Sequence, residues 1–493
     1  MKTLYYYCII LYTHYIKEGC ALLEKLGFIA KSEKRLKALE ALRSALLSKP
    51  YMYALLLLAC VITVTGTEFC GLLIFVCIIT LTLIISDELI ATTLPFMLAS
   101  ATMIKCFDSF DTYIKLAPLA PFLVLAIILH FTLYPKPIKA GSTLWSLIAV
   151  TVAVTLGGLG SISAKEYFSL TSLYYVVGLG AAMVIVYIIA YSYLESSDRV
   201  VIHKTFAFVM YIVCLFSCLM IIMHYAVNIR EVASTRSILE PQWRNNVSTF
   251  IILTMPFVFY LSLKNYIYVI PAFITMPCLA LTSSRGGLLF GAVEFLLCCI
   301  YIIYADKKNR FKTLFILTVC GFAMIIYAGD IITFISKTIS RFDSDMINKD
   351  PRTGFIKRAV EDFKACPVFG RGIGYMGNRD IYPSKKFAAN WYQSAPFQVI
   401  GSFGSLGIFA FGFQFIRRNM IFWSKITHFS LAVFIAYIGI FLMSLVNPGE
   451  FCPVPYELMT VVMFALIERH CPQNKEIILF RKKYAAKAED NRK

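Results

Sequence analysis

Residues 205–226 read TFAFVMYIVCLFSCLMIIMHYA and contain no Asp, Glu, Lys or Arg. An α-helix rises 1.5 Å per residue, so about 20 apolar residues cross the roughly 30 Å hydrocarbon core of a bilayer. Lipid offers the backbone no hydrogen-bond partners, and a segment that crosses it alone must therefore be helical. This stretch predicts a transmembrane helix.

Similar runs recur along the 493 residues, of which 59% are hydrophobic and only 15% charged, against about 25% charged residues in a soluble domain. The sequence therefore predicts an all-α, polytopic membrane bundle of about 12–14 transmembrane helices. A membrane barrel would instead show alternating segments of about ten residues. The expected spans are 51–66, 69–86, 89–105, 117–134, 142–161, 169–194, 205–226, 248–263, 266–283, 286–304, 312–328, 395–416, 427–446 and 455–468.

One long polar segment interrupts these spans. Most transporter cores have little need of such an insertion, whereas an enzyme that acts on a lipid-borne substrate needs polar groups held at the membrane face. The expected divisions are an interfacial amphipathic segment, a first bundle, a long extracytoplasmic loop with short helices, the last spans and a basic tail: 1–50, 51–328, 329–394, 395–468 and 469–493.

A helix is expected within the long loop. Asp350 can act as its N-cap and Pro351 as its first residue, and Pro367 would close it. Between them, apolar residues recur at helical spacing, so we expect one face to rest on the bundle. These residues are Phe355, Ile356, Ala359, Val360 and Phe363.

The net charge of +18 is distributed in short loops and at both ends of the chain. This pattern is typical of the positive-inside rule and of anionic headgroups rather than of nucleic-acid binding. It predicts that both termini are cytoplasmic and that the long loop faces outward. The basic residues that define the cytoplasmic side are Lys136, Lys139, Arg199, Lys204, Lys307, Lys308, Arg310, Arg417 and Arg418.

The 15 cysteines show no zinc-binding pattern, and most lie inside apolar runs, where Cys behaves as a small hydrophobic residue. Cys366 and Cys452 fall in predicted outer loops. A disulfide between them and two separate thiols are both compatible with the sequence. We expect no metal and no cofactor.

Two arginines are the first candidates for chemistry. Arg285 follows Ser284 at the outer end of a span and precedes two glycines, which allow close approach of a ligand or backbone. An arginine this close to hydrocarbon is a functional candidate, the alternative being an interfacial anchor. Arg352 lies in the first turn of the loop helix, and its alternative is a solvated charge. Two arginines together suit a diphosphate, because each planar guanidinium binds two oxygens.

Polar and glycine-rich segments follow in the loop and at the re-entry into the membrane. Arg371 lies in the turn Gly370 to Gly374, which lacks the preceding strand of a dinucleotide-binding fingerprint. Gln393, Ser394 and Gln398 lead into Gly404-Ser405-Leu406-Gly407. Ordinary polar flanking of a helix is the alternative interpretation.

In combination these segments resemble the O-antigen ligase/polymerase family. The resemblance is carried by Ser284-Arg285-Gly286-Gly287, by Arg352 before a Pro-x-x-Gly-x-Gly-x-Gly turn, and by Gly404 and Gly407 at the end of a third motif. That motif begins with a histidine, and counting back places Gln393 at the histidine position. The motifs cover about residues 285–407.

The resemblance implies a metal-independent, inverting glycosyltransferase on the outer face of a bacterial plasma membrane. Its donor would be an undecaprenyl-diphosphate-linked glycan and its acceptor a glycan or a lipid-linked molecule. Arg285 and Arg352 would bind the diphosphate, and Gln393 would hold the place of the catalytic histidine. Ser284, Ser394, Gln398 and Arg371 would contact substrate, the first three from the motifs and the last from the glycine turn.

The glutamine leaves the mechanism open. Glutamine cannot accept a proton at neutral pH, so another base acts, the leaving diphosphate contributes more, or activity is lost. His224, Glu361 and Glu450 are alternative bases on the outer face. Ligation and polymerisation are not distinguished by these motifs. Other functions remain open, namely a polysaccharide flippase or transporter, and a non-catalytic scaffold of the same pathway.

Overall fold

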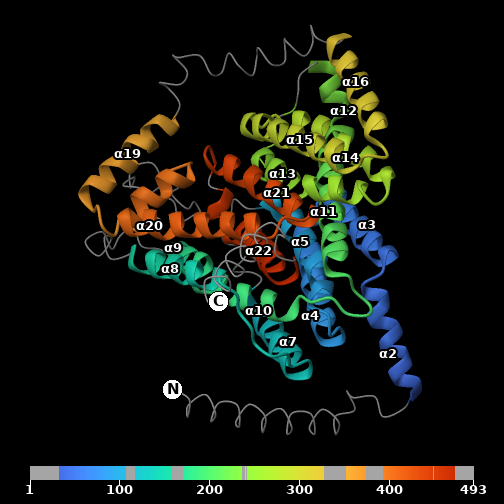
Figure 1. Ribbon diagram of the computed structural model, residues 1–493, viewed down its shortest axis with the longest axis horizontal. Coiled ribbons are helices and arrows are strands. Elements are labelled where there is room, and N and C mark those ends of the chain that lie inside the picture. Colours follow the sequence, from blue (N-terminus) through green and yellow to red (C-terminus); the bar gives the residue numbers. More distant parts are fainter. Residues whose placement is uncertain are drawn as a thin grey trace, which may run out of the picture.

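The protein is all-helical, and the part of the chain that the structure describes contains no strand (Figure 1). A computed structural model defines this fold. It describes residues 33–106, 117–157, 170–235, 239, 241, 243–326, 351–373, 392–447 and 449–471. The fold class predicted from the apolar runs is confirmed at this level.

Each of the fourteen predicted segments overlaps one or more helices of the part of the chain that the structure describes. The first bundle contains α3 (Lys49–Thr65), α4 (Glu68–Ile85), η1 (Leu89–Thr92) with α5 (Thr93–Thr102), α7 (Ala120–Leu133), α8 (Thr143–Leu156), α9 (Leu170–Leu179) with α10 (Ala181–Tyr193), α11 (Ile202–Val227), α13 (Arg244–Ser262), α14 (Val269–Leu281), α15 (Arg285–Ala305) and α16 (Arg310–Ile326). The C-terminal helices are α20 (Ala395–Ser424), α21 (His428–Ser444) and α22 (Leu458–His470). Shorter elements are α2 (Glu33–Leu46), η2 (Met103–Cys106), η3 (Ala117–Leu119), α12 (Ile229–Thr235), η5 (Tyr266–Tyr268), α19 (Pro351–Ala365), η7 (Gly449–Phe451) and η8 (Pro453–Glu457).

Six helical stretches among the described residues are long and apolar enough to cross a membrane, or seven if the bent pair α2–α3 counts as one span. Five further apolar helices have 10–17 residues. Helices of this kind indicate a membrane protein. The six are Glu68–Ile85, Leu173–Tyr193, Ile202–Val227, Arg244–Ser262, Arg285–Ala305 and Ala395–Ser424.

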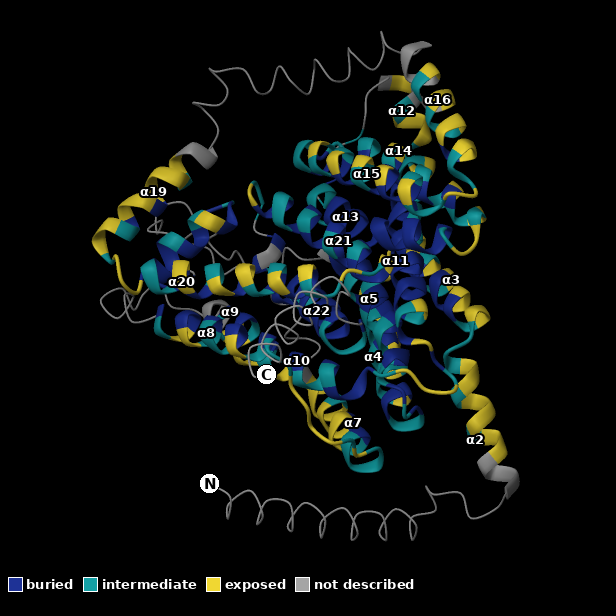
Figure 2. Cartoon of the chain, viewed as in Figure 1, coloured by how far each residue is buried: buried dark blue, intermediate teal, exposed yellow. Residues whose placement is uncertain are grey.

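The centre of the fold is formed by α11, α13, α21 and α22, whose residues are mostly buried (Figure 2). In α13 every residue from Val247 to Ser262 is buried, because this helix packs against α11, α15 and α21 on its different sides. A helix that is apolar all round is expected in such a position. Peripheral helices such as α15 keep one apolar face exposed, as lipid contact requires.

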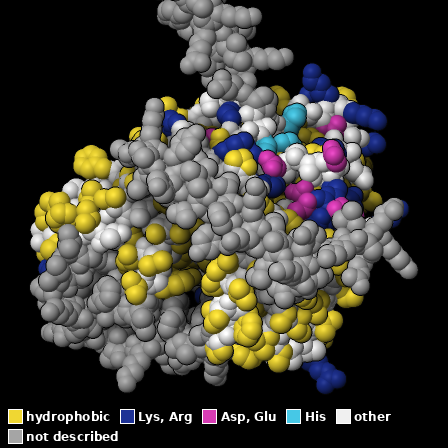
Figure 3. Space-filling view, turned by 90° about the horizontal axis from the view of Figure 1, so that it is seen from below, with side chains coloured by type: hydrophobic (Ala, Val, Ile, Leu, Met, Phe, Trp, Pro, Cys, Tyr) yellow, Lys and Arg dark blue, Asp and Glu magenta, His cyan; other side chains and the backbone are white. Residues whose placement is uncertain are grey.

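Charged side chains gather at one end of the bundle. Arg199 pairs with Asp87 and Glu40, and Lys136 pairs with Glu195 at 2.9 Å. Figure 3 shows basic, acidic and histidine side chains gathered on one part of the face seen from below. Lys136 and Arg199, predicted to share a side, therefore lie at the same end of the molecule.

Arg418 departs from that prediction. Its side chain is 1% exposed and forms an ion pair with Glu457, with its guanidinium carbon 5.3 Å from the centre of the Tyr437 ring. Gln414 also donates to the same carboxylate, at 3.3 Å. The assignment of Arg418 to a basic loop is wrong, because α20 continues to Ser424 and carries Arg418 inside the bundle.

The predicted loop helix is present as α19, which begins at Pro351 and packs against α20. The predicted contact face is partly wrong. Ala359 is buried and Phe355 packs beside it, but Ile356 and Val360 are each 37% exposed. Asp362, a charged residue, is buried on the packed face, whereas the predicted Phe363 is only half-buried. The contact is therefore rotated away from Ile356 and Val360.

Cys366 and Cys452 are free thiols, so the structure has two separate cysteines rather than a disulfide at these positions. Asp350, Gly374 and most of the predicted extracytoplasmic loop, together with 1–32 and 472–493, lie outside the described residues. Of Arg352 and Glu450 the structure describes the backbone and not the side chain.

Candidate functional site

Arg285 is the first residue of α15 and is placed by a tightly bonded turn. Ser284 is the N-cap of this helix, and its hydroxyl accepts from the Gly287 N–H at 3.1 Å. The same hydroxyl donates to Oδ1 of Asn245 at 2.8 Å. Ser284 is 1% exposed, and its hydroxyl both accepts and donates a hydrogen bond within the protein. It therefore fixes the start of α15 from the protein interior.

The bond from Ser284 to Asn245 joins the N-terminus of α15 to that of α13. Arg244 is the first residue of α13, whose N-cap Trp243 provides no side-chain capping bond. The two arginines therefore begin neighbouring helices, and both helices point their positive ends in this direction. Arg244 was not among the residues predicted from the sequence.

A small cavity of about 60 Å³ lies at these two helix starts. The cavity suits a compact anion, because an arginine at the first position of each of two helices lies among its lining residues, and helix N-termini favour anions. Its small size favours a phosphate group over a sugar. It is lined by Arg244, Asn245, Ser283, Arg285, Gly286, Met443, Val446 and Asn447.

The two glycines after Arg285 allow α15 to pack closely against α13 and the end of α21. A Cβ on Gly287 would lie 2.5 Å from the Ser248 side chain of α13, and a Cβ on Gly286 would lie 2.9 Å from Cγ2 of Val446. The atoms that approach these two glycines closely belong to the side chains of neighbouring residues. Larger residues here would separate α15 from α13 and from the end of α21.

The re-entry of the long loop forms a second structural unit. The α20 helix is broken at Gly404, with φ 60° and ψ −150°, and the glycine-rich turn docks on this break. Arg371 N–H donates to the Gly401 carbonyl and Gly372 N–H to the Ser402 carbonyl, both at 2.9 Å. In return Ser405 N–H donates to the Pro367 carbonyl at 2.8 Å.

The two glycine patterns are thus two sides of one backbone junction. A Cβ on Gly404 would lie 2.7 Å from the Pro367 carbonyl oxygen, and a Cβ on Gly370 would clash with the backbone of Ser402 and Phe403. Gly370 and Gly372 also have positive φ, which favours glycine. Arg371 enters the junction through its backbone.

Gln398 organises the entry into α20. It is fully buried, its Oε1 accepts from the Tyr392 N–H at 3.0 Å, and its Nε2 donates to Ser402 Oγ at 2.7 Å. Ser394 is the buried N-cap residue of the same helix, and its hydroxyl makes no capping bond. Both ends of the Gln398 amide are used within the protein.

Tyr392 connects this entry to the loop helix. Its hydroxyl donates to Oδ2 of Asp362 in α19 at 2.6 Å, and both side chains are buried. Burial raises the pKa of the Asp362 carboxyl, and the bond from Tyr392 and the charges of Arg358 and Arg371 only partly offset this effect. The roles of Asp362 and Tyr392 were not predicted from the sequence. Each lies in a polar segment where such a residue is ordinary, and their bond joins positions 30 residues apart.

Among the described residues, Ser283 and Gln393 are the non-glycine residues with positive φ, at 58° and 59°. Each lies in or directly beside a predicted motif. Residues held in this region cost of order 1 kcal/mol or more and cluster at functional sites. Gln393 is half-buried between Tyr392 and Ser394.

The chain segment 447–451 connects the two units. Asn447 lines the arginine cavity, and the Phe451 ring packs against Phe403 at the break in α20, with ring centres 6.3 Å apart. Four residues of chain span at most about 14 Å. A short stretch of chain therefore links the cavity to the break in α20.

His224 and Glu361, two of the alternative bases, lie in different surroundings. The His224 ring lies edge-on to Trp243, with ring centres 5.4 Å apart, and so stands beside the start of α13. Glu361 is exposed and lies 3.5 Å from Arg358. Of the two, His224 is the one that contacts Trp243, the residue before Arg244 in the chain.

Taken together, these features describe an all-helical membrane protein with an anion-sized cavity at two helix starts. Comparisons of the chain with protein families, with curated proteins and with solved structures return no match.

Proposed function

We propose that the chain is a membrane glycosyltransferase that moves a glycan from undecaprenyl diphosphate to an acceptor on the outer face of a bacterial plasma membrane. The acceptor is a growing glycan or a lipid-linked molecule, and the full set of 12–14 spans and the outward long loop belong to this proposal. The observation that carries it is the cavity shared by Arg244 and Arg285.

The chemistry of that cavity matches the leaving group. Breaking a sugar–phosphate bond develops negative charge on the diphosphate, and fixed cations in a water-poor site stabilise it. Removing one such donor typically costs about 3–4 kcal/mol of barrier, or about 10²–10³ in kcat. In this proposal Arg244 and Arg285 hold the diphosphate, and Arg352 approaches it from the first turn of α19.

The acceptor side is assigned to the re-entry unit. Gln393 has the strained backbone of a residue held in place by its surroundings, and its amide can orient an acceptor hydroxyl. His224, beside Trp243, is the proposed proton acceptor.

A transporter is the second candidate, and one observation favours it. Arg418 and Glu457 form a buried ion pair within the bundle, and intramembrane charges often mark a substrate or proton pathway. Arg418 packs against aromatic rings, and the arginine cavity lies at the end of the bundle. The enzyme is therefore preferred.

The test uses purified, reconstituted protein with an undecaprenyl-diphosphate glycan and candidate acceptors, and measures release of the lipid diphosphate. We expect Arg244→Ala and Arg285→Ala to reduce the rate by about 10²–10³ while the protein stays folded. Arg310→Ala is the matched control, because Arg310 also begins a helix, α16, away from the cavity.

Three further variants separate the roles. Arg352→Ala tests the third cation, His224→Ala tests the base, and Gln393→His restores the histidine. Normal turnover by both Arg244→Ala and Arg285→Ala would refute the diphosphate site. Lipid binding without release in every variant would favour the transporter or a scaffold.

A further inference from the structure

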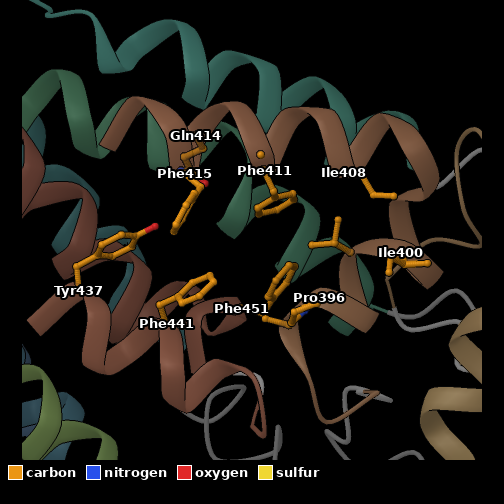
Figure 4. A pocket seen from close by; sticks show the side chains of 12 residues that line it. Pro396, Ile400, Ile408, Phe411, Gln414, Phe415, Tyr437, Phe441 and Phe451 are labelled. Atoms are coloured by element: carbon orange, nitrogen blue, oxygen red, sulfur yellow. The ribbon is translucent and has the colours of Figure 1, made fainter. Parts of the chain in front are cut away.

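A second cavity, of about 340 Å³, lies between α20 and α21. Its walls are mostly aromatic and aliphatic, and none of the lining residues is charged. Figure 4 shows Phe411 and Phe415 of α20 and Phe441 of α21 pointing into the same space. Cavities of this size and apolar character are typical of ligand sites, which span roughly 300–1,000 Å³.

The cavity borders the lipid-facing surface of α20. Ile408 and Phe415 line it and are 43% and 41% exposed, and the neighbouring Phe409 is 76% exposed. In a membrane-spanning helix such apolar exposure is lipid contact. A molecule dissolved in the bilayer therefore reaches the cavity sideways, without crossing water.

The arginine cavity lies on a different face of α21. Tyr437 and Phe441 line the apolar cavity, whereas Met443 and Val446 line the arginine cavity. Residues at i and i+4 share a face of a helix, and Met443 and Val446 are turned away from that face. The occupant of the apolar cavity thus has no cation among the lining residues for a charged headgroup.

We propose that this cavity binds one acyl chain of a bilayer phospholipid. Gln414 also lines the cavity, and its amide nitrogen donates to Glu457, so this donor is engaged within the protein. The proposal is independent of the glycosyltransferase reaction.

The bound chain also supports the re-entry unit. Before the break at Gly404, α20 presents Ala395, Pro396, Val399 and Ile400 to the cavity. Another face of the same segment carries Gln398, which accepts from the Tyr392 N–H, and Ser402, which accepts from the Gln398 amide. An empty void beside this segment loses packing contacts, so an acyl chain favours the docked position of the loop.

Gly412 offers a direct way to block the cavity. It lines the cavity, and a Cβ placed on it meets no atom within 4 Å, so Gly412→Leu fills the space without a backbone clash. Gly321→Leu in α16 is the matched control, because Gly321 also lies in a helix, has no atom within 4 Å of a Cβ and lines neither cavity described above.

The probe is a phosphatidylglycerol with a diazirine in one acyl chain, incorporated into phosphatidylglycerol nanodiscs that contain the full chain. Photolabelled peptides are mapped by mass spectrometry. We expect labelling within 395–415 and 437–451 in the wild type and in Gly321→Leu. In Gly412→Leu we expect labelling about tenfold lower, the change for a loss of about 1.4 kcal/mol of binding free energy.

A second readout follows the loop. Adding phosphatidylglycerol to delipidated protein should slow amide hydrogen exchange in 392–403 for the wild type and Gly321→Leu, and not for Gly412→Leu. Equal labelling in all three proteins, or none, would overturn the proposal. So would labelling of these peptides by an isoprenoid phosphate probe that displaces the phospholipid.

Discussion

Replacing Gly404 by alanine should undock the loop from α20. Gly404 has φ 60° and ψ −150°, a conformation open almost only to glycine, and an alanine there costs about 1–3 kcal/mol of strain. Its Cβ would also lie 2.7 Å from the carbonyl oxygens of Pro367 and Val368, which are backbone atoms and cannot rotate away.

Relief of that clash requires the turn to move. The turn then loses the bonds from Ser405 N–H to the Pro367 carbonyl and from Leu406 N–H to the Val368 carbonyl. Each bond contributes about 0.5–1.5 kcal/mol. Together with the strain this gives about 2–6 kcal/mol, so local opening should be at least roughly 30-fold more populated, since 1.4 kcal/mol corresponds to tenfold.

The assay is amide hydrogen exchange of 367–373 and 398–406 by mass spectrometry in nanodiscs. Gly412→Ala is the matched control, because it lies in the same helix with no atom within 4 Å of its Cβ. That substitution should be neutral or stabilising by up to about 1 kcal/mol. Equal exchange in Gly404→Ala and Gly412→Ala would refute the junction as described here.

Two further predictions concern buried charges. Because the folded pKa of Asp362 is raised, its contribution to the docking of α19 is complete below its ordinary pKa of about 3.9 and is lost as the pH rises through the folded value. The side-chain oxygen in Asp362→Asn can still accept from Tyr392. This variant should make the docking of α19 independent of pH in this window and tighter at neutral pH. Hydrogen exchange of 355–366 across a pH series checks this expectation, and an unchanged pH dependence would contradict it. Arg418→Met should lower stability by about 3–5 kcal/mol, whereas Arg418→Met with Glu457→Leu should recover most of the loss, measured by thermal unfolding in detergent. Additive losses in the double variant would contradict the assignment of a mutual ion pair.

The helices themselves were predictable because their signal is local. Each apolar run is long enough to be read without knowledge of its neighbours, and the position of α11 and the start of α20 followed from composition alone. The continuation of α20 to Ser424 did not. The side of α19 that packs was predicted less well. Helical spacing placed Ile356 and Val360 on the contact, but the bond between Asp362 and Tyr392, residues 30 positions apart, sets a different rotation.

The arginine cavity shows the same division between local and long-range information. Arg285 stood out because it adjoins two glycines at the end of an apolar run. Arg244 lies in a polar linker where a charged residue is ordinary, and only the bond from Ser284 to Asn245, 39 residues apart, brings it to Arg285. Likewise, the glycine turn after Pro367 and the Gly404 to Gly407 pattern were recognised separately. The break at Gly404 and the steric requirement that joins it to the turn are properties of the folded chain.

The backbone at Gln393 bears on how the missing histidine can be tested. Its φ of 59° lies in the left-handed region, where histidine is enriched several-fold among non-glycine residues. The buried neighbours Tyr392 and Ser394 hold the chain on both sides, and the bond from Tyr392 N–H to Gln398 fixes the entry into α20. A histidine at position 393 therefore meets the same backbone without added strain. For this reason a change in turnover in Gln393→His, with unchanged hydrogen exchange at 392–403, would report the chemistry of the side chain rather than a rearranged fold.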